Sequence, residues 1–128
     1  MKIRLQLILS LFVFLLAISG PVSAHHAWSG YDMRDLTTVK GTVTEFDFSN
    51  PHIWISFEVK DDKGSIQKWN AGGPSPNRLA NSGWDRNTLK SGDQITFVGN
   101  RISNGTFSMK LQKIVLPDGR ELNSYGGH

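Results

Sequence analysis

The sequence predicts a small all-β protein in which five strands close into a barrel and one short helix lies between strands three and four. Two observations predict this fold class. Segments rich in β-branched and aromatic residues recur between clusters of turn residues, and a single short stretch carries the start and stop signals of a helix. The resulting element order is that of the small OB-fold. An open β-sandwich is the alternative, although a closed sheet leaves fewer exposed strand edges.

Residues 1–24 are predicted to be a cleaved signal peptide. Lys2 and Arg4 provide a short positive start, an apolar stretch runs from Leu5 to Ile18, and small residues at Val22–Ala24 suit signal peptidase. The apolar stretch is shorter than the roughly 20 residues of a spanning helix, so a membrane anchor is the weaker interpretation. We therefore expect a periplasmic or secreted protein with no membrane anchor after processing.

Cleavage would leave one small domain, with an N-terminal arm at 25–37 and the OB-like barrel at 38–128. Without Lys2 and Arg4 the basic residues fall from 14 to 12, against 11 acidic residues. This balance does not favour nucleic acid as a partner. The chain contains no cysteine, which excludes disulfides, a thiol nucleophile, a zinc–thiolate site and an iron–sulfur cluster.

The first strand is predicted over Thr38–Phe48. Val39 and Val43 share one face, and the apolar phase then changes near Glu45, which indicates a bulge or sharp bend. The preceding residues, His25 to Asp32, follow neither the helical nor the strand period. They are expected to form an irregular arm.

The second strand, His52–Val59, has the clearest alternation in the chain. Trp54 is expected to point outward, between the residues of the core face, which are Ile53, Ile55, Phe57 and Val59. Asp61–Gly64 is a hairpin turn that leads into a third strand at Ser65–Ala71.

The short helix follows Ser75, a plausible N-cap, and ends before Gly83. Trp84 is then expected to fold back onto the core. Two further strands are predicted at Gln94–Asn100 and Thr106–Leu116, with a turn at Asn104–Gly105 between them, and a short tail strand is predicted around Glu121–Leu122. The core face of Thr106–Leu116 is expected to hold Phe107, Met109, Leu111 and Val115.

Several blocks along the mature chain occur together in one family. They are Ala24–Trp28, Lys40–Val43, Asn50–Ile55, Trp69, Ser75–Leu79, Gly83–Trp84 and Leu89–Asp93. The set resembles the small exported bacterial proteins of domain of unknown function family 6152. That family has no established activity, so the resemblance implies export and fold but no mechanism. Where it implies an acidic residue shortly after Trp69, this chain has Asn70–Ala71–Gly72.

Three histidines are candidate metal ligands. After cleavage, the α-amine and a ring nitrogen of His25 would form a bidentate chelate, and His26 would add an imidazole, a ligand that suits copper, zinc and nickel. His52 is the third candidate. Met33 and Met109 carry thioethers, which favour copper(I), but Met109 falls on a core face. The competing interpretation of His25 and His26 is that they belong to a solvated terminus. The competing interpretation of His52 is that it hydrogen-bonds to a loop carbonyl.

Exposed aromatic rings are the second candidate feature. Trp28 in the arm and Trp54 on the outward face are predicted to bind a ligand, because aromatic residues on such a barrel stack on sugars or bases. The competing interpretation is that Trp28 and Trp54 cover each other, while Trp69 and Trp84 lie in the core.

These features predict an exported, non-enzymatic binding protein, with copper or another transition metal as the candidate ligand. The alternative is a barrel that binds an oligosaccharide or a partner protein through Trp54. The sequence has no nucleophile elbow and no phosphate-binding loop. A copper-dependent oxidase is the remaining enzymatic hypothesis.

The predicted cleavage site is directly testable. Mass spectrometry of the exported protein should find His25 at its N-terminus, because the small residues before it follow the apolar stretch. An intact chain that begins at Met1 in the membrane fraction would contradict this prediction.

Overall fold

The computed structural model describes residues 30–125, which form six strands and one short helix. The predicted signal peptide and the candidate residues His25, His26 and Trp28 lie outside this range. The strands are β1 (Tyr31–Asp47), β2 (Trp54–Lys60), β3 (Ile66–Gly72), β4 (Gln94–Ile102), β5 (Ser108–Val115) and β6 (Glu121–Asn123), and the helix is α2 (Pro76–Ala80).

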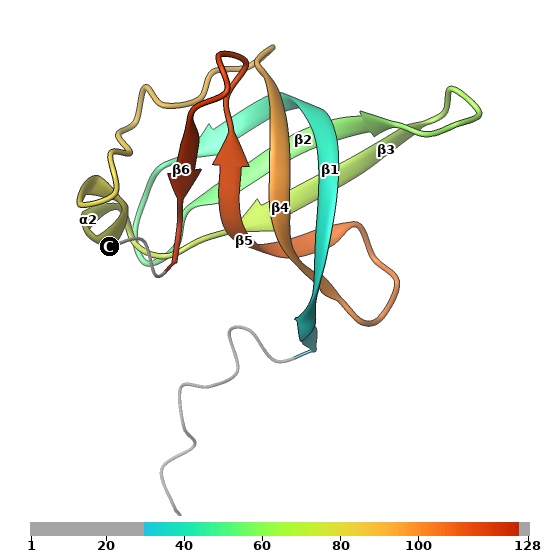
Figure 1. Ribbon diagram of the computed structural model, residues 1–128, viewed down its shortest axis with the longest axis horizontal. Helices are drawn as coiled ribbons and strands as arrows, with labels where there is room; N and C mark the ends of the chain where they lie inside the picture. The colour runs from blue at the N-terminus through green and yellow to red at the C-terminus, as the bar shows by residue number, and fades with distance from the viewer. Residues whose placement is uncertain (1–29, 126–128) are drawn as a thin grey trace, which may run out of the picture.

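The strands form one sheet whose order is β3-β2-β1-β4-β5-β6. A parallel pairing of β3 with β5 closes β1, β2, β3, β5 and β4 into a ring, and all other pairings are antiparallel. The strands wrap around a common interior, and β6 extends the sheet beyond β5 (Figure 1). The predicted five-strand order is therefore confirmed, and the β3–β5 pairing distinguishes it from an open sandwich.

The first strand begins earlier than the sequence predicts. β1 starts at Tyr31, inside the segment that was expected to be an irregular arm, because its first part pairs with β4. A register shift between Tyr31 and Leu36 interrupts this pairing, which hides the strand period in the sequence. A second shift between Val43 and Glu45 confirms the predicted bulge.

The core lies inside the ring and is built around stacked aromatic rings. Phe57 stacks on Phe97 with ring centroids 3.8 Å apart and on Trp69 at 6.0 Å. The inward orientation of Ile53, Ile55 and Phe57 is confirmed, since each is at most 1% exposed, whereas Trp54 is 42% exposed. Strict alternation along β2 thus separates core from surface.

The prediction of which β5 residues face the core is wrong near the two ends of the predicted strand. A register shift in the β4–β5 pairing leaves Gln112 as an extra residue, so the alternation changes phase after Leu111. Ile114 is therefore fully buried in place of Val115, which is half-buried. Phe107, also expected in the core, is 37% exposed and precedes the strand.

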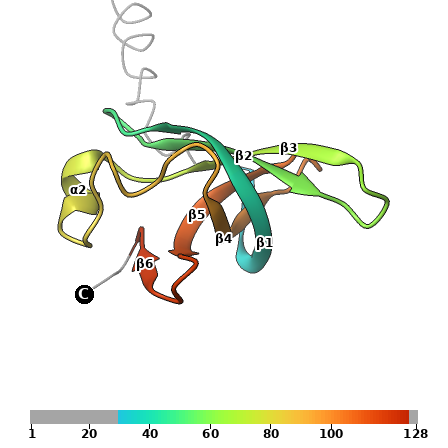
Figure 2. The same cartoon turned by 90° about the horizontal axis from the view of Figure 1, so that it is seen from above.

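Helix α2 covers one end of the ring, opposite the β2–β3 hairpin (Figure 2). The carbonyl of Ser75 accepts hydrogen bonds from the amides of Arg78 and Leu79, and Gly83 adopts a φ of 87° after the helix. Trp84 then returns to the core, as predicted, and its indole donates to the carbonyl of Asn123. Within residues 30–125 no helix is long and apolar enough to cross a membrane.

The register of β2 predicts unequal effects of two substitutions. Phe57→Ala should lower the free energy of unfolding by about 3–5 kcal/mol, because it opens a cavity in the aromatic stack. Trp54→Ala should cost well under half of that, because a large part of its ring is already exposed. Urea unfolding of both variants provides the measurement, and equal destabilisation would contradict this register.

Candidate functional site

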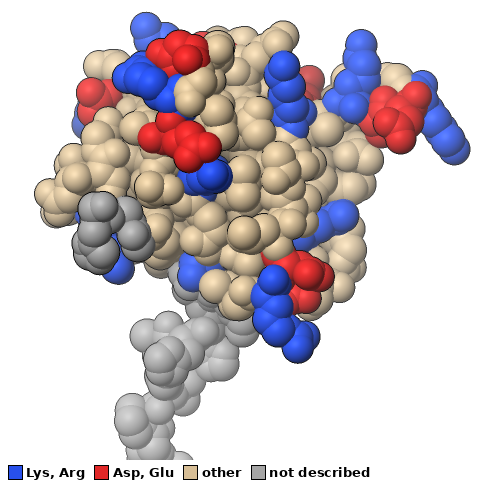
Figure 3. Space-filling view, in the orientation of Figure 1, with Lys and Arg blue, Asp and Glu red and all other residues tan. Residues whose placement is uncertain are grey.

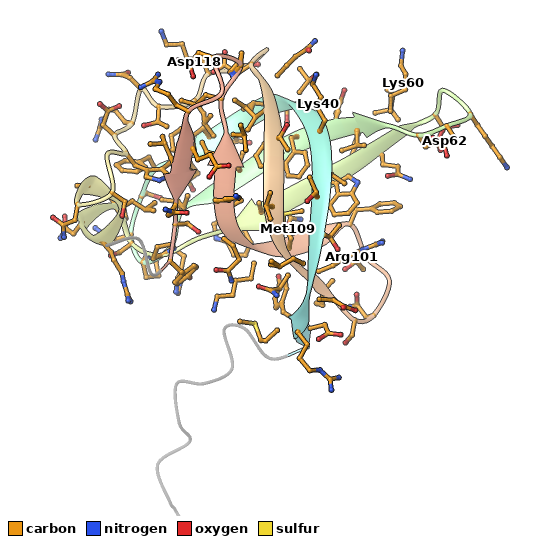
Figure 4. The ribbon with its side chains drawn as sticks, in the orientation of Figure 1. Lys40, Lys60, Asp62, Arg101, Met109 and Asp118 are labelled. Carbon is orange, nitrogen blue, oxygen red and sulfur yellow. The ribbon has the colours of Figure 1, made fainter. Side chains whose placement is uncertain are left out.

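The candidate metal ligands within residues 30–125 do not come together. In this part of the chain no group of three or more His, Asp or Glu side chains is placed to hold a metal ion. Met109 is fully buried and packs in the core (Figure 4), as the sequence indicates. Met33 is 52% exposed, so its thioether is accessible.

His52 lies in the segment that connects β1 to β2, where it is half-buried. The amide of the next residue, Ile53, donates to the carbonyl of Pro74, and the Ile53 carbonyl accepts from Gly73. These bonds place His52 beside the segment that leads into α2. It thus stands near the end of β1 at which Asp47 pairs with Trp54.

The chain enters the described region at the other end of β1. The backbone amide and hydroxyl of Ser103 donate hydrogen bonds of 2.7 and 2.8 Å to the carbonyl of Gly30. A shallow depression at this position is lined by Gly30, Tyr31, Asp32, Met33, Arg34 and Ser103. The histidines of the predicted mature terminus therefore connect to the ring beside the β4–β5 turn, whereas His52 is near the opposite end of β1.

The outward residues of four strands form one continuous surface, which we call the Trp54 face. In its first row Asp47 of β1 lies opposite Trp54, Trp54 opposite Gly72 of β3, and Gly72 opposite Lys110 of β5. A parallel second row consists of Glu45, Ser56, Asn70 and Ser108. Directly opposed side chains have Cβ atoms about 5 Å apart, so the side chains of the second row are neighbours, whereas in the first row Gly72 separates Trp54 from Lys110 by the width of one strand.

Side-chain hydrogen bonds hold the β3–β5 half of the second row. The hydroxyl of Ser108 donates to the Asn70 amide oxygen at 2.6 Å, and the Tyr31 hydroxyl lies 3.0 Å from the Ser108 oxygen. With its oxygen used in this way, the Asn70 amide nitrogen is oriented to donate elsewhere. In the first row, Asp47 accepts a hydrogen bond of 2.5 Å from Ser49.

The β5 side of the face is positively charged. The ammonium of Lys110 lies 4.4 Å from the centre of the Tyr125 ring, and the Arg78 guanidinium lies 5.9 Å from the same ring. Partial burial, and secondarily the charge of Arg78, lower the pKa of Lys110 below its ordinary value. The β1 side carries the carboxylates of Glu45 and Asp47, so charge changes sign across the face.

Charges elsewhere are mixed. Lysine and arginine side chains alternate with aspartate and glutamate over the surface seen in Figure 3. On that face of the molecule the two signs are interspersed and do not gather into one basic patch.

Sequence reasoning found Trp54 but missed the side chains that surround it. Asn70, Ser108 and Lys110 are not distinctive in sequence. The β2–β3 pairing brings Asn70 near Trp54, and the β3–β5 pairing brings Ser108 and Lys110 there. The sole advance signal was the alternation of outward and inward residues within each strand.

Comparison with known proteins identifies a family but no function. A model described as "Family of unknown function (DUF6152)" matches residues 13–110. A search of curated proteins finds no match.

The positive charge of Arg78, which lies over the same Tyr125 ring as Lys110, predicts a pKa change. Arg78→Gln should raise the pKa of Lys110 toward its ordinary value, because it removes a neighbouring positive charge. In the wild type the unfolded chain binds a proton at Lys110 more readily than the folded protein does. The free energy of unfolding therefore rises with pH between the folded-state pKa and the unfolded-state pKa of Lys110. The variant should narrow this pH range. NMR titration of the lysine side chains measures the shift, with exposed Arg86→Gln as the control. An unchanged Lys110 pKa in Arg78→Gln would contradict the assignment.

Proposed function

We propose that this chain, which belongs to the DUF6152 family of unknown function, is an exported, non-enzymatic protein that binds a transition metal at its processed N-terminus. Copper is the metal that the donor set favours. The observation that carries the proposal is the position of His25 and His26 directly after the predicted cleavage site. The periplasm, or the medium after secretion, would be the place of function.

The chemistry of the terminus supports metal binding. Cleavage creates an α-amine on His25 that chelates together with the ring nitrogen of the same residue, and His26 supplies a second imidazole. The α-amine has an ordinary pKa near 7.7–8.0 and histidine near 6.5, so all three nitrogens become available as ligands around neutral pH.

Residues 30–125 offer few further ligands for a metal ion bound at the N-terminus. In residues 30–125 no three His, Asp or Glu side chains are placed together to hold a metal, so this part of the chain would add at most one or two such ligands to the terminal site. Met33 is exposed and lines the same depression as Gly30, which makes it the nearest described candidate for an added thioether ligand.

Participation of His52 is a stronger form of the proposal. The tether that could carry His25 and His26 toward His52 is short, because residues 31–36 belong to β1. The tether is therefore the segment from His25 to Gly30, which spans at most roughly 18 Å when fully extended. The hydrogen bonds of Ser103 to Gly30 fix its origin at the far end of β1 from His52. A terminal site that does not include His52 is the simpler arrangement.

The test compares three proteins by calorimetric titration with copper(II) against a competing chelator. The mature protein should bind at least about tenfold more tightly than a version with the four residues Gly-Ser-Gly-Ser added before His25, because this addition moves the α-amine away from both imidazoles, whereas a single added residue would still let it chelate together with His26. Affinity should fall as pH drops below about 6.5, since protons compete for the imidazoles and the amine.

The third protein, His52→Ala, separates the two forms of the proposal. Unchanged affinity supports a terminal site, and a loss of affinity supports participation of the ring. Equal, weak copper affinity in the mature and extended proteins would refute the proposed chelate.

A further inference from the structure

One large aromatic side chain stands among hydrogen-bonding groups on the Trp54 face. Around the half-exposed indole of Trp54, the two rows supply carboxylates from β1, a hydroxyl from β2, an amide from β3, and a hydroxyl and an ammonium from β5. These groups are Asp47, Glu45, Ser56, Asn70, Ser108 and Lys110. Gly72, directly beside Trp54, adds no side chain to the surface.

A sugar ring has the complementary chemistry. One face of a pyranose presents C–H groups that pack on an indole, while its edge presents hydroxyls that both donate and accept hydrogen bonds. On this surface the carboxylates accept, Lys110 and the Asn70 amide nitrogen donate, and the hydroxyl groups do either. Both kinds of partner thus lie next to the aromatic platform.

The same surface is poorly suited to two other ligand classes. A nucleic acid would place phosphates near the carboxylates of Glu45 and Asp47, which repel them. A protein interface usually has an apolar centre, but the other large exposed apolar side chains of the described chain lie outside the two rows. These are Met33, Leu36, Ile66 and Phe107.

The shape of the surface selects among glycans. The two rows run straight across four neighbouring strands, so a ligand that contacts both ends of a row has to be extended. A β-1,4-linked chain is extended and ribbon-like and lays successive ring faces on such a surface. An α-1,4-linked chain coils and presents fewer rings at once.

We propose that the Trp54 face binds an extended, β-1,4-linked glycan chain. Trp54 stacks on one pyranose ring, and Asp47, Asn70 and Lys110 hydrogen-bond to its hydroxyls and those of the adjacent rings. This site is separate from the proposed metal site, because it uses neither His25 nor His26.

The test uses the mature protein with cellohexaose and chitohexaose as probes and maltohexaose as the comparison. On addition of a β-1,4-linked hexamer, NMR should show a shift of the Trp54 indole signal and of the Asn70 side-chain amide. The indole signals of Trp69 and Trp84 should stay in place, because these indoles donate within the protein to Gln67 and Asn123. Maltohexaose should bind more weakly.

Three variants test whether glycan binding depends on the Trp54 ring. Trp54→Ala should lower the affinity for the hexamer at least about tenfold, which is the usual scale for an aromatic anchor. Trp54→Phe should keep part of the affinity, and its folding is checked by thermal unfolding. Ile66→Ala removes a similarly exposed apolar side chain from the same face of β3 and should leave binding unchanged.

Three outcomes would overturn the proposal. They are an absence of binding to both β-1,4-linked hexamers, binding that survives in Trp54→Ala, and an equal loss in Ile66→Ala. A double variant, His25→Ala with His26→Ala, should bind the hexamer normally. Failure of copper binding and failure of glycan binding are thereby distinguished.

Discussion

The parallel pairing of β3 with β5 is the contact on which the closed ring depends. It consists of three residue pairs, Asn70–Ser108, Ala71–Met109 and Gly72–Lys110. The backbone amide of Asn70 also donates to the backbone carbonyl of Phe107, so the pairing extends into the β4–β5 turn. Without this contact β3 would be an open edge, and the surface around Trp54 would lose its β5 side.

An arginine holds the turn against the core and thereby supports this contact. The guanidinium of Arg101 lies 5.0 Å from the centre of the Trp69 ring and 5.3 Å from that of Phe107, toward the β4–β5 end of the ring (Figure 4). It also donates to the carbonyls of Gly105 and Thr106. Because Trp69 stacks on Phe57, the turn is joined through one aromatic series to the middle of the core.

Local signals predicted much of this fold, and non-local pairings account for the rest. The alternation of β2, the hairpin turns and the position of α2 directly after Ser75 depend on neighbours in sequence, and these predictions are confirmed, although the Ser75 hydroxyl makes no capping hydrogen bond and the helix is capped at Asn81. The early start of β1 and the extra residue at Gln112 depend on pairing with β4, which a single strand does not reveal. The same holds for the site. The outward position of Trp54 can be predicted from the alternation of its own strand, but the position of Lys110 on the same face cannot.

The alternation that hides one side of each strand also has an evolutionary consequence. Inward residues such as Phe57 and Ala71 specify the ring, while their outward neighbours Ser56 and Asn70 contribute little to its packing. Selection can therefore alter the outer surface by point substitution while the fold stays the same. Two buried glycines are as restricted as the inward residues: a Cβ at Gly99 would collide with the backbone of Lys110, and one at Gly41 would lie 2.6 Å from the Phe57 ring. Diversification within this lineage should be rapid on the outer face and slow at those two positions.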